Sequence, residues 1–233
     1  MITNLWQGRR MSNNGQHMKK FRMLFYVPAK DGHYVDNGIA SWTRLFNLDA
    51  PKELICSHEE IWLPSDGNGF INTGRNGIDY LGYCWTSTMG QVGGKNRTGS
   101  GVRKAPASEI LKNPKRWFYA EFEVFDFGYR EMLTMMQVEL ESNQGYDKLM
   151  ILNFFIPLGI GDKDKWICSE FSNNHALIGF KYSKATSQST YQIAVKKIIN
   201  DTMSPLRTAK RLWQYGVDFY NLDGSLLLAE KKV

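Results

Sequence analysis

The chain has 233 residues, of which 42% are hydrophobic and 22% charged, and its formal net charge is +6. This composition excludes a disordered chain, a collagen-like repeat and a coiled coil, and the length is sufficient for one large domain with its own core. The cysteines number three, which does not make a complete disulfide framework and favours reduced thiols. No apolar stretch is long enough to span a membrane, and the N-terminus lacks the apolar segment of a secretory signal, so we expect no export by that route.

Predicted strands dominate the first half of the chain. Residues 1–20 are polar and are expected to form an arm, which is followed by a strand at 21–27 and a short amphipathic helix at 39–46. Two extended segments, 54–63 and 69–73, are separated by turn-forming residues and are expected to pair as a hairpin. Aromatic and β-branched side chains predict two further strands, at 81–87 and 117–127.

Predicted helices dominate the second half. Apolar spacing predicts one helix over 129–140 and another that begins after Asp162 or Asp164 and continues through Leu177. Ser204 as N-cap and Pro205 at the first helical position mark the start of a third. Strands followed by helices favour an α+β fold with a mainly antiparallel sheet, and we expect residues 21–233 to form a single domain.

A basic segment separates the predicted strands. Between Lys95 and Arg116, seven side chains are basic and one is acidic, and four glycines lie at 93–101. We interpret it as a flexible basic loop, with a glycine-rich insertion near 90–104. A solvated loop without a ligand is the simpler interpretation. The alternative is a docking surface for an anionic partner that uses Lys95, Arg97, Arg103 and Lys104.

Cys168 is the cysteine with the strongest indication of chemistry. It follows a turn-forming stretch and opens a predicted amphipathic helix. The positive end of a helix dipole favours a thiolate, and the free N–H groups there can bind an oxyanion. A buried, inert cysteine is the alternative interpretation.

A nucleophilic thiolate needs an imidazole, and His58 is the best candidate. Of the other histidines, His17 lies in the polar arm, His33 beside a turn, and His175 about 10 Å along the helix from Cys168. His58 lies in a predicted strand, and the expected partner strand carries Asn72, whose amide can hold an imidazole. An ordinary hydrogen-bonded histidine in a sheet is the alternative.

Metal binding is the alternative role for cysteine and histidine side chains in this part of the chain. Cys56 and His58 share one face of the predicted strand, and Cys84 can lie nearby. The chain has no second pair at ligand spacing, which argues against structural zinc.

Three short motifs together resemble a known superfamily. They are Ser57-His58-Glu59-Glu60-Ile61 on a strand, Gly145-Tyr146-Asp147 before a helix, and Cys168-Ser169-Glu170-Phe171 opening a helix. Their order resembles the permuted NlpC/P60 superfamily, and more narrowly its YiiX-like, papain-fold amidases, which include poxviral and phage members. The histidine precedes the cysteine by 110 positions (168 minus 58), which is the permuted order. The resemblance runs from about residue 25 to residue 212.

The resemblance implies a papain-like fold and a role for each matching residue. Cys168 matches the nucleophile, His58 the general base, and Tyr146 a tyrosine that lines the site. Asn72 best matches the third polar residue, which becomes Thr73 if the predicted hairpin slips by one position. The implied activity is that of a cysteine peptidase, amidase or acyltransferase on a cell-wall peptide or a lipid acyl group, without a metal or organic cofactor.

Two other classes of function remain open from the sequence. An idle papain-like protein of a virion or assembly that binds a partner fits the polar arm, the basic insertion and the missing export signal, and implies a cytoplasmic or virion-associated protein. Nucleic-acid binding through the basic segment is the weaker alternative, because no known nucleic-acid module is present.

Overall fold

The computed structural model describes residues 18–30, 34–65, 70–72, 78–88, 101–142, 167–181 and 204–229. For residues 35, 70–72, 78 and 79 it describes the backbone alone.

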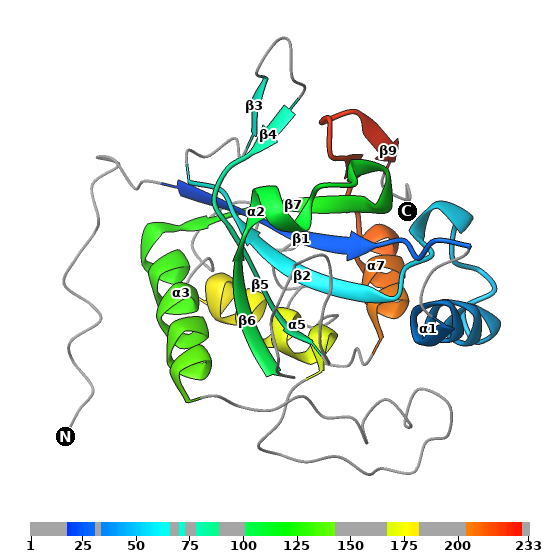
Figure 1. Ribbon diagram of the computed structural model, residues 1–233, viewed down its shortest axis with the longest axis horizontal. Coiled ribbons are helices and arrows are strands. Elements are labelled where there is room, and N and C mark those ends of the chain that lie inside the picture. The colour runs from blue at the N-terminus through cyan, green and yellow to red at the C-terminus, as the bar shows by residue number, and fades with distance from the viewer. Residues whose placement is uncertain are drawn as a thin grey trace.

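A seven-stranded antiparallel sheet organises the described part of the chain (Figure 1). Its strand order is β6-β5-β2-β1-β7-β8-β9, and every pairing along it is antiparallel. The strands are β1 (Met18–Tyr26), β2 (His58–Leu63), β5 (Tyr83–Thr88), β6 (Gly101–Pro106), β7 (Trp117–Phe125), β8 (Phe219–Asn221) and β9 (Leu226–Leu228). A separate two-stranded sheet contains β3 (Phe70–Asn72) and β4 (Ile78–Tyr80). With the helices, this confirms the predicted α+β class and the antiparallel sheet.

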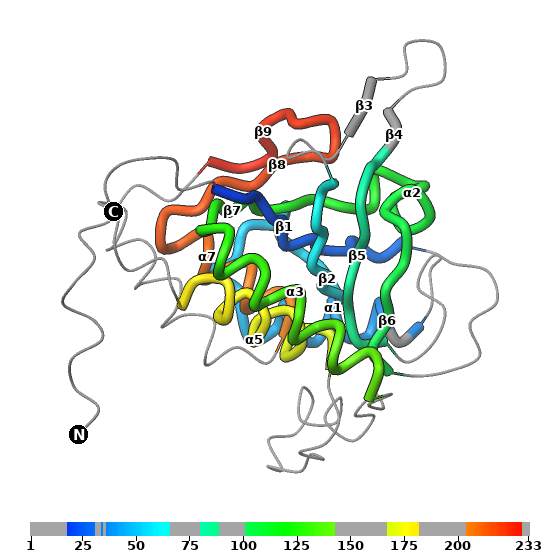
Figure 2. Tube along the Cα trace, turned by 90° about the vertical axis from the view of Figure 1, so that its left-hand side faces the viewer, coloured from blue at the N-terminus to red at the C-terminus, as the bar shows by residue number. Residues whose placement is uncertain are grey.

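Helices α3, α5 and α7 lie together on one face of the large sheet (Figures 1 and 2). α1 packs against α7 at the side, and the residues at the end of α2 pack on the opposite face. The helices are α1 (Tyr34–Leu45), α2 (Ala107–Ile110), α3 (Asp126–Glu141), α5 (Cys168–Lys181) and α7 (Pro205–Gln214), with short 3-10 turns η1 (Lys52–Leu54) and η2 (Pro114–Arg116). The hydroxyl of Ser204 accepts a hydrogen bond from the N–H of Arg207 at 3.3 Å, which confirms the predicted N-cap of α7.

The alternation of side chains along β1 separates two apolar cores. Phe21, Met23 and Phe25 are fully buried on the face that α3, α5 and α7 cover, and Leu24 is buried with Trp62 on the other face. Because successive side chains of a strand point to opposite faces, the central strands are apolar on both sides.

Two glycines allow α3 and α5 to approach closely. A Cβ added to Gly128 of α3 meets the carbonyl oxygen of Gly179 in α5 at 2.4 Å, so a larger side chain there forces the helices apart. Small residues at this crossing thus set how closely the two helices pack.

Two expectations about strands need correction. β1 begins at Met18, so residues 18–20 belong to the sheet and not to a polar arm. The predicted hairpin is wrong: the neighbours of β2 are β1 and β5, and β3 pairs with β4. Strand pairing is chosen by long-range packing, and a turn signal between two extended segments does not decide it.

The predicted basic loop is also wrong over residues 101–116. This stretch contains β6, α2 and η2, and alternate residues of β6 are buried because the strand pairs with β5 along its full length. Lys95 and Arg97 lie outside the described residues. In the part of the chain that the structure describes, no helix combines the length and the apolar character needed to cross a membrane.

Candidate active site

His58 is the first residue of β2, at the end of the strand where it pairs with Tyr26 of β1. Its Nε2 lies 3.1 Å from Oε1 of Glu60. The two side chains meet because residues two apart on a strand share a face. Thr86 of the neighbouring strand β5 places its hydroxyl 3.4 Å from the same nitrogen, and Trp117 presents its ring edge-on at 6.4 Å between centroids. The imidazole is therefore enclosed by three strands.

Glu60 has a second charged partner, Arg103 of β6. An Nη2 donor of Arg103 forms a short hydrogen bond to the same Glu60 oxygen that contacts His58. Glu60 is fully buried and Arg103 is 6% exposed, so both charges lie out of water. A buried carboxylate needs such pairing, because an unpartnered charge in the protein interior is strongly unfavourable.

Cys168 is the first residue of α5, so the helix begins later than the predicted start after Asp162 or Asp164, and the prediction that Cys168 lies in its first turn is confirmed. Its thiol lies near the His58 ring and acts to raise the pKa of that imidazole. The first intrahelical bond of α5 runs from the N–H of Phe171 to the carbonyl of Ile167, at 3.0 Å, so the N–H of Cys168 precedes the hydrogen-bonded helix. The structure thus brings together a thiol, an imidazole and a carboxylate from segments that are far apart in the sequence.

The pKa values of His58 and Glu60 are set by burial on one side and by their charged neighbours on the other. Burial of the His58 ring opposes its protonation, but Cys168 and Glu60 outweigh burial and raise the pKa of His58 from 6.5 to about 9. Burial acts to raise the pKa of Glu60, yet Arg103 and His58 prevail and lower it, so that carboxyl group is ionised. An ionised carboxylate only accepts hydrogen bonds, and His58 therefore donates from Nε2.

The two other buried thiols, Cys56 and Cys84, and the neighbouring carboxyl group of Glu59 all have raised pKa values. Burial raises the pKa of Cys56 and of Cys84 well above that of an ordinary thiol. Glu59 lies on the opposite face of β2 from Glu60, where burial and the nearby Cys168 raise its pKa. The charged partner of His58 is Glu60, which contacts its Nε2 and whose own pKa is lowered.

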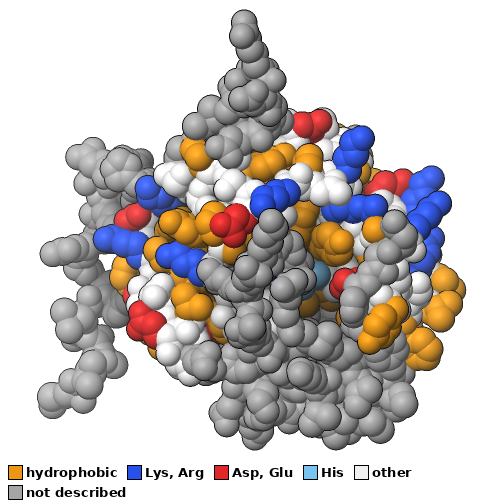
Figure 3. Space-filling model, in the orientation of Figure 1, with side chains coloured by type: hydrophobic (Ala, Val, Ile, Leu, Met, Phe, Trp, Pro, Cys, Tyr) orange, Lys and Arg blue, Asp and Glu red, His pale blue; other side chains and the backbone are white. Residues whose placement is uncertain are grey.

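The cluster is only slightly exposed to solvent. Cys168 exposes 4% of its surface and His58 exposes 5%. Figure 3 shows a small area of pale-blue histidine surface on the face in view. The thiol and the imidazole thus present little surface to solvent.

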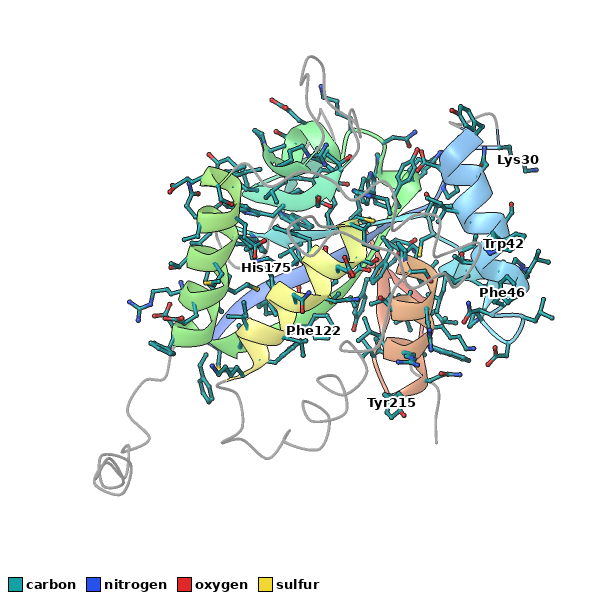
Figure 4. All side chains as sticks on the ribbon, turned by 90° about the horizontal axis from the view of Figure 1, so that it is seen from below. Lys30, Trp42, Phe46, Phe122, His175 and Tyr215 are labelled. Atoms are coloured by element: carbon teal, nitrogen blue, oxygen red, sulfur yellow. The ribbon has the colours of Figure 1, made fainter. Side chains whose placement is uncertain are left out.

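The structure does not describe the side chains of Asn72 and Tyr146, the other two predicted site residues. Asn72 ends β3, away from the strands that flank His58, and its side chain lies outside the description. Tyr146, His17 and His33 also lie outside the described residues. His175 sits between α3 and α5, apart from Cys168 (Figure 4).

Glu60 and Arg103 are the residues that the sequence analysis missed. The place beside the imidazole that it assigns to Asn72 is occupied by Glu60. The spacing of His58 and Glu60, two positions apart on a predicted strand, was the available signal. Arg103 had no such signal, because its contact depends on the pairing of β5 with both β2 and β6.

The chain matches no family model, and it has no significant match among curated proteins or among solved structures. Within the described residues, no three histidine, cysteine or acidic side chains are grouped so that they could hold a metal ion.

Proposed function

We propose that this protein is a cysteine hydrolase or acyltransferase that acts on an amide or ester, with Cys168, His58 and Glu60 as its catalytic group. The observation that carries the proposal is the chain of contacts from the Cys168 thiol through the His58 ring to the Glu60 carboxylate. A nucleophile paired with a base that a third group orients is the arrangement that activates a thiol.

The reaction follows from the position of each group. His58 holds the proton of Cys168, and the thiolate attacks the carbonyl carbon of the substrate. The backbone N–H of Cys168, ahead of the first hydrogen-bonded turn of α5, supports the developing oxyanion. His58 then protonates the leaving amine or alcohol as the acyl-thioester forms. Water or an acceptor alcohol or amine, deprotonated by His58, releases the acyl group.

Glu60 is assigned the orienting role that the resemblance gave to Asn72. Its carboxylate holds the Nε2–H of His58, which leaves Nδ1 for the thiol proton. Arg103 keeps the carboxylate ionised and fixed in place. A Cys-His-Glu group replaces the Cys-His-Asn group of the sequence-based hypothesis, because β5 rather than β3 adjoins β2.

The permuted NlpC/P60 resemblance supports the same proposal. An antiparallel sheet that carries the histidine, with a helix that begins at the cysteine, is compatible with a permuted papain-like fold. A cell-wall peptide or a lipid acyl group remains the proposed substrate class.

The deciding experiment compares the reactivity of the three cysteines in the native protein. Alkylation with iodoacetamide at pH 7 is followed by peptide mapping, together with labelling by an electrophilic acyl probe. We expect Cys168 to react at least about ten times faster than Cys56 and Cys84, because burial raises the pKa of those two thiols. The His58→Ala variant is expected to lose this difference. Equal labelling of all three thiols contradicts the proposal.

A second candidate function rests on the low exposure of Cys168 and His58. It is a papain-like protein that binds a partner and performs no chemistry. In that case Cys168 resists the acyl probe until urea unfolds the chain, and His58→Ala leaves its labelling unchanged.

A further inference from the structure

Helix α1 and the turn after it expose several large apolar side chains on one side of the molecule. Tyr34 is 79% exposed and Leu45 61%, and in the turn Phe46 is 69% and Leu48 77% exposed. Figure 3 shows hydrophobic side chains at the right-hand edge of the molecule, where Figure 1 places α1. Exposed apolar side chains that gather in one patch mark a surface that another molecule covers.

The exposed residues of α1 follow the spacing of a helix that pairs with another helix. Tyr34, Gly38, Ser41 and Leu45 succeed one another at intervals of four, three and four residues. Intervals that alternate between three and four place side chains in one narrow stripe along a helix, and two helices pack through such stripes. We call these four residues the α1 seam.

The opposite side of α1 is already packed inside the molecule. Ile39, Ala40 and Thr43 are buried on that side, and α1 packs against α7. The carboxylate of Asp36 accepts a hydrogen bond from the hydroxyl of Ser57 at 3.4 Å. These contacts hold the helix to the domain, so the seam is its outward surface.

The middle of the seam allows a second backbone to approach closely. A Cβ added to Gly38 meets no atom within 4 Å, so the space above this residue is open. Ser41, one turn later, is small and exposed. Because the distance between two packed helices depends on the side chains at the crossing, small residues there favour a close crossing, with Tyr34 and Leu45 on either side of it.

Two further aromatic rings border the seam. Trp42 and Phe46 lie four residues apart, with their ring centroids 5.3 Å apart. Figure 4 shows both of them at the outer side of α1. Tryptophan, tyrosine and phenylalanine are the side chains that are enriched at protein–protein interfaces, so the border extends the same kind of surface.

The size of this surface fits a reversible interface between two copies. At their exposures, the rings of Tyr34 and Phe46 present on the order of 300 Å². Together with Leu45, Leu48 and the seam, each copy contributes roughly 500 Å², and two copies bury roughly 1,000 Å², which is the lower end for a specific interface.

The charges around the seam carry both signs. Residues 34–54 contain Arg44 and Lys52 together with Asp36, Asp49 and Glu53, and α7 adds Arg207, Arg211 and Lys210, of which Lys210 is paired with Asp49. A second copy of a surface that carries both signs supplies a basic group for each acidic one, which a partner of a single sign does not.

We infer that two copies of this chain associate through α1, with the seam of one helix packed against the seam of the other across a two-fold axis. The copies cross at Gly38 and Ser41, and the apolar side chains at both ends of the seam and in the turn after it are buried by the contact. This association does not depend on the proposed catalytic function.

The test measures the mass of the full-length protein by sedimentation velocity. Over about a hundred-fold range of protein concentration, we expect a monomer to convert to a dimer, because association follows mass action. Leu45→Lys places two like charges at the crossing and is expected to weaken association at least about ten-fold. The lysine suits the last turn of a helix, so the fold is retained. Val138→Lys, at a 51% exposed apolar position near the end of α3, is the matched control and should associate as the wild type does.

A second variant separates association from folding. Gly38→Gln replaces a residue of low helix propensity by a better helix former, so the monomer should unfold at the same or a higher urea concentration. Its side chain fills the open space at the crossing, so the dimer should be weakened at least about ten-fold. A wild-type protein that stays monomeric at every concentration, or association unchanged in both seam variants, overturns the inference.

A lipid surface is the other occupant that an apolar helix face accepts, and vesicles of phosphatidylcholine and phosphatidylserine test it. Dimerisation without sedimentation of the protein on these vesicles supports the second copy. Binding of a monomeric protein to the vesicles, lost in Leu45→Lys and kept in Val138→Lys, assigns the seam to a membrane surface and overturns the inference.

Discussion

The described part of the chain contains two buried histidine–glutamate pairs, and they differ in what else lies beside the imidazole. At His58, Nε2 contacts Glu60, and the Cys168 thiol lies near the ring. At His175, Nδ1 donates to the carbonyl of Phe171 at 2.7 Å, and Nε2 lies 3.4 Å from Glu139. Nδ1 of His175 is therefore engaged by its own helix, and Nε2 faces the carboxylate of α3.

The surroundings of the two pairs differ as well. Glu60 has Arg103 as a second partner and lies between strands, whereas Glu139 and His175 join two helices, α3 and α5. The first pair has a thiol beside it and a balancing cation, Arg103. The second ties together helices that already approach closely at Gly128 and Gly179. A buried histidine–carboxylate contact is thus insufficient for catalysis, and the partner of the other ring nitrogen decides its use.

The largest expected difference between the pairs is in activity. His58→Ala is expected to lower turnover of an activated ester by about 1,000-fold or more, because the thiol loses its base. His175→Ala is expected to keep turnover per folded molecule within about two-fold. Steady-state kinetics, corrected for the folded fraction by active-site titration, measure both. An equal loss in the two variants contradicts the distinction.

A smaller effect on activity is expected when the Glu60 carboxylate loses its charge. Because the pKa of His58 is raised to about 9, the imidazolium that protonates the leaving group persists below that pH and is lost as the pH rises through it. Activity should fall along an upper limb near pH 9. Glu60→Gln removes a charge that raises this pKa, so its limb should move to lower pH, with turnover reduced by on the order of 10–100-fold.

Glu139→Gln is the matched control for this comparison. Glu139 is on α3 and contacts His175, so its variant should keep the wild-type pH profile. If the upper limb of the pH–activity profile moves in both Glu60→Gln and Glu139→Gln, the shift is a general effect of protein charge and not of the contact between Glu60 and His58.

The His175→Ala variant combines the smallest expected effect on activity with the largest expected effect on the free energy of unfolding. His175→Ala leaves a cavity beside Phe171 and removes the donor to its carbonyl, so we expect the free energy of unfolding to fall by about 3 kcal/mol. His58→Ala should cost less, because Glu60 keeps its contact with Arg103. Urea denaturation measures both values. A larger loss for His58→Ala contradicts the structural role of His175.

Much of the fold follows from local patterns in the sequence. The position of Cys168 in the first turn of α5, the N-cap at Ser204 and a strand over most of residues 21–27 depend on neighbouring residues, and the sequence predicts all three. Boundaries are predicted less well: β1 begins at Met18 because Lys20 and Arg22 are held in the strand by ion pairs with Glu121 of β7.

The strand neighbours of His58 required the tertiary structure. The sequence placed Asn72 beside the imidazole because the turn after Leu63 suggests a hairpin. In the folded chain, β5 occupies that position, with Cys84 opposite Trp62, because its apolar residues contribute to both cores.

By itself, the sequence determined the class of the fold and the two elements that carry Cys168 and His58, because helix starts and strand periodicity are set by residues close in the chain. Only the tertiary structure decided that Glu60 contacts the ring, that Arg103 is buried against Glu60 and that Lys104 lies on the other face, over the ring of Trp85. The physical reason is that β6 reaches β2 only through β5, and the two faces of a paired strand send adjacent basic side chains to opposite sides of the sheet.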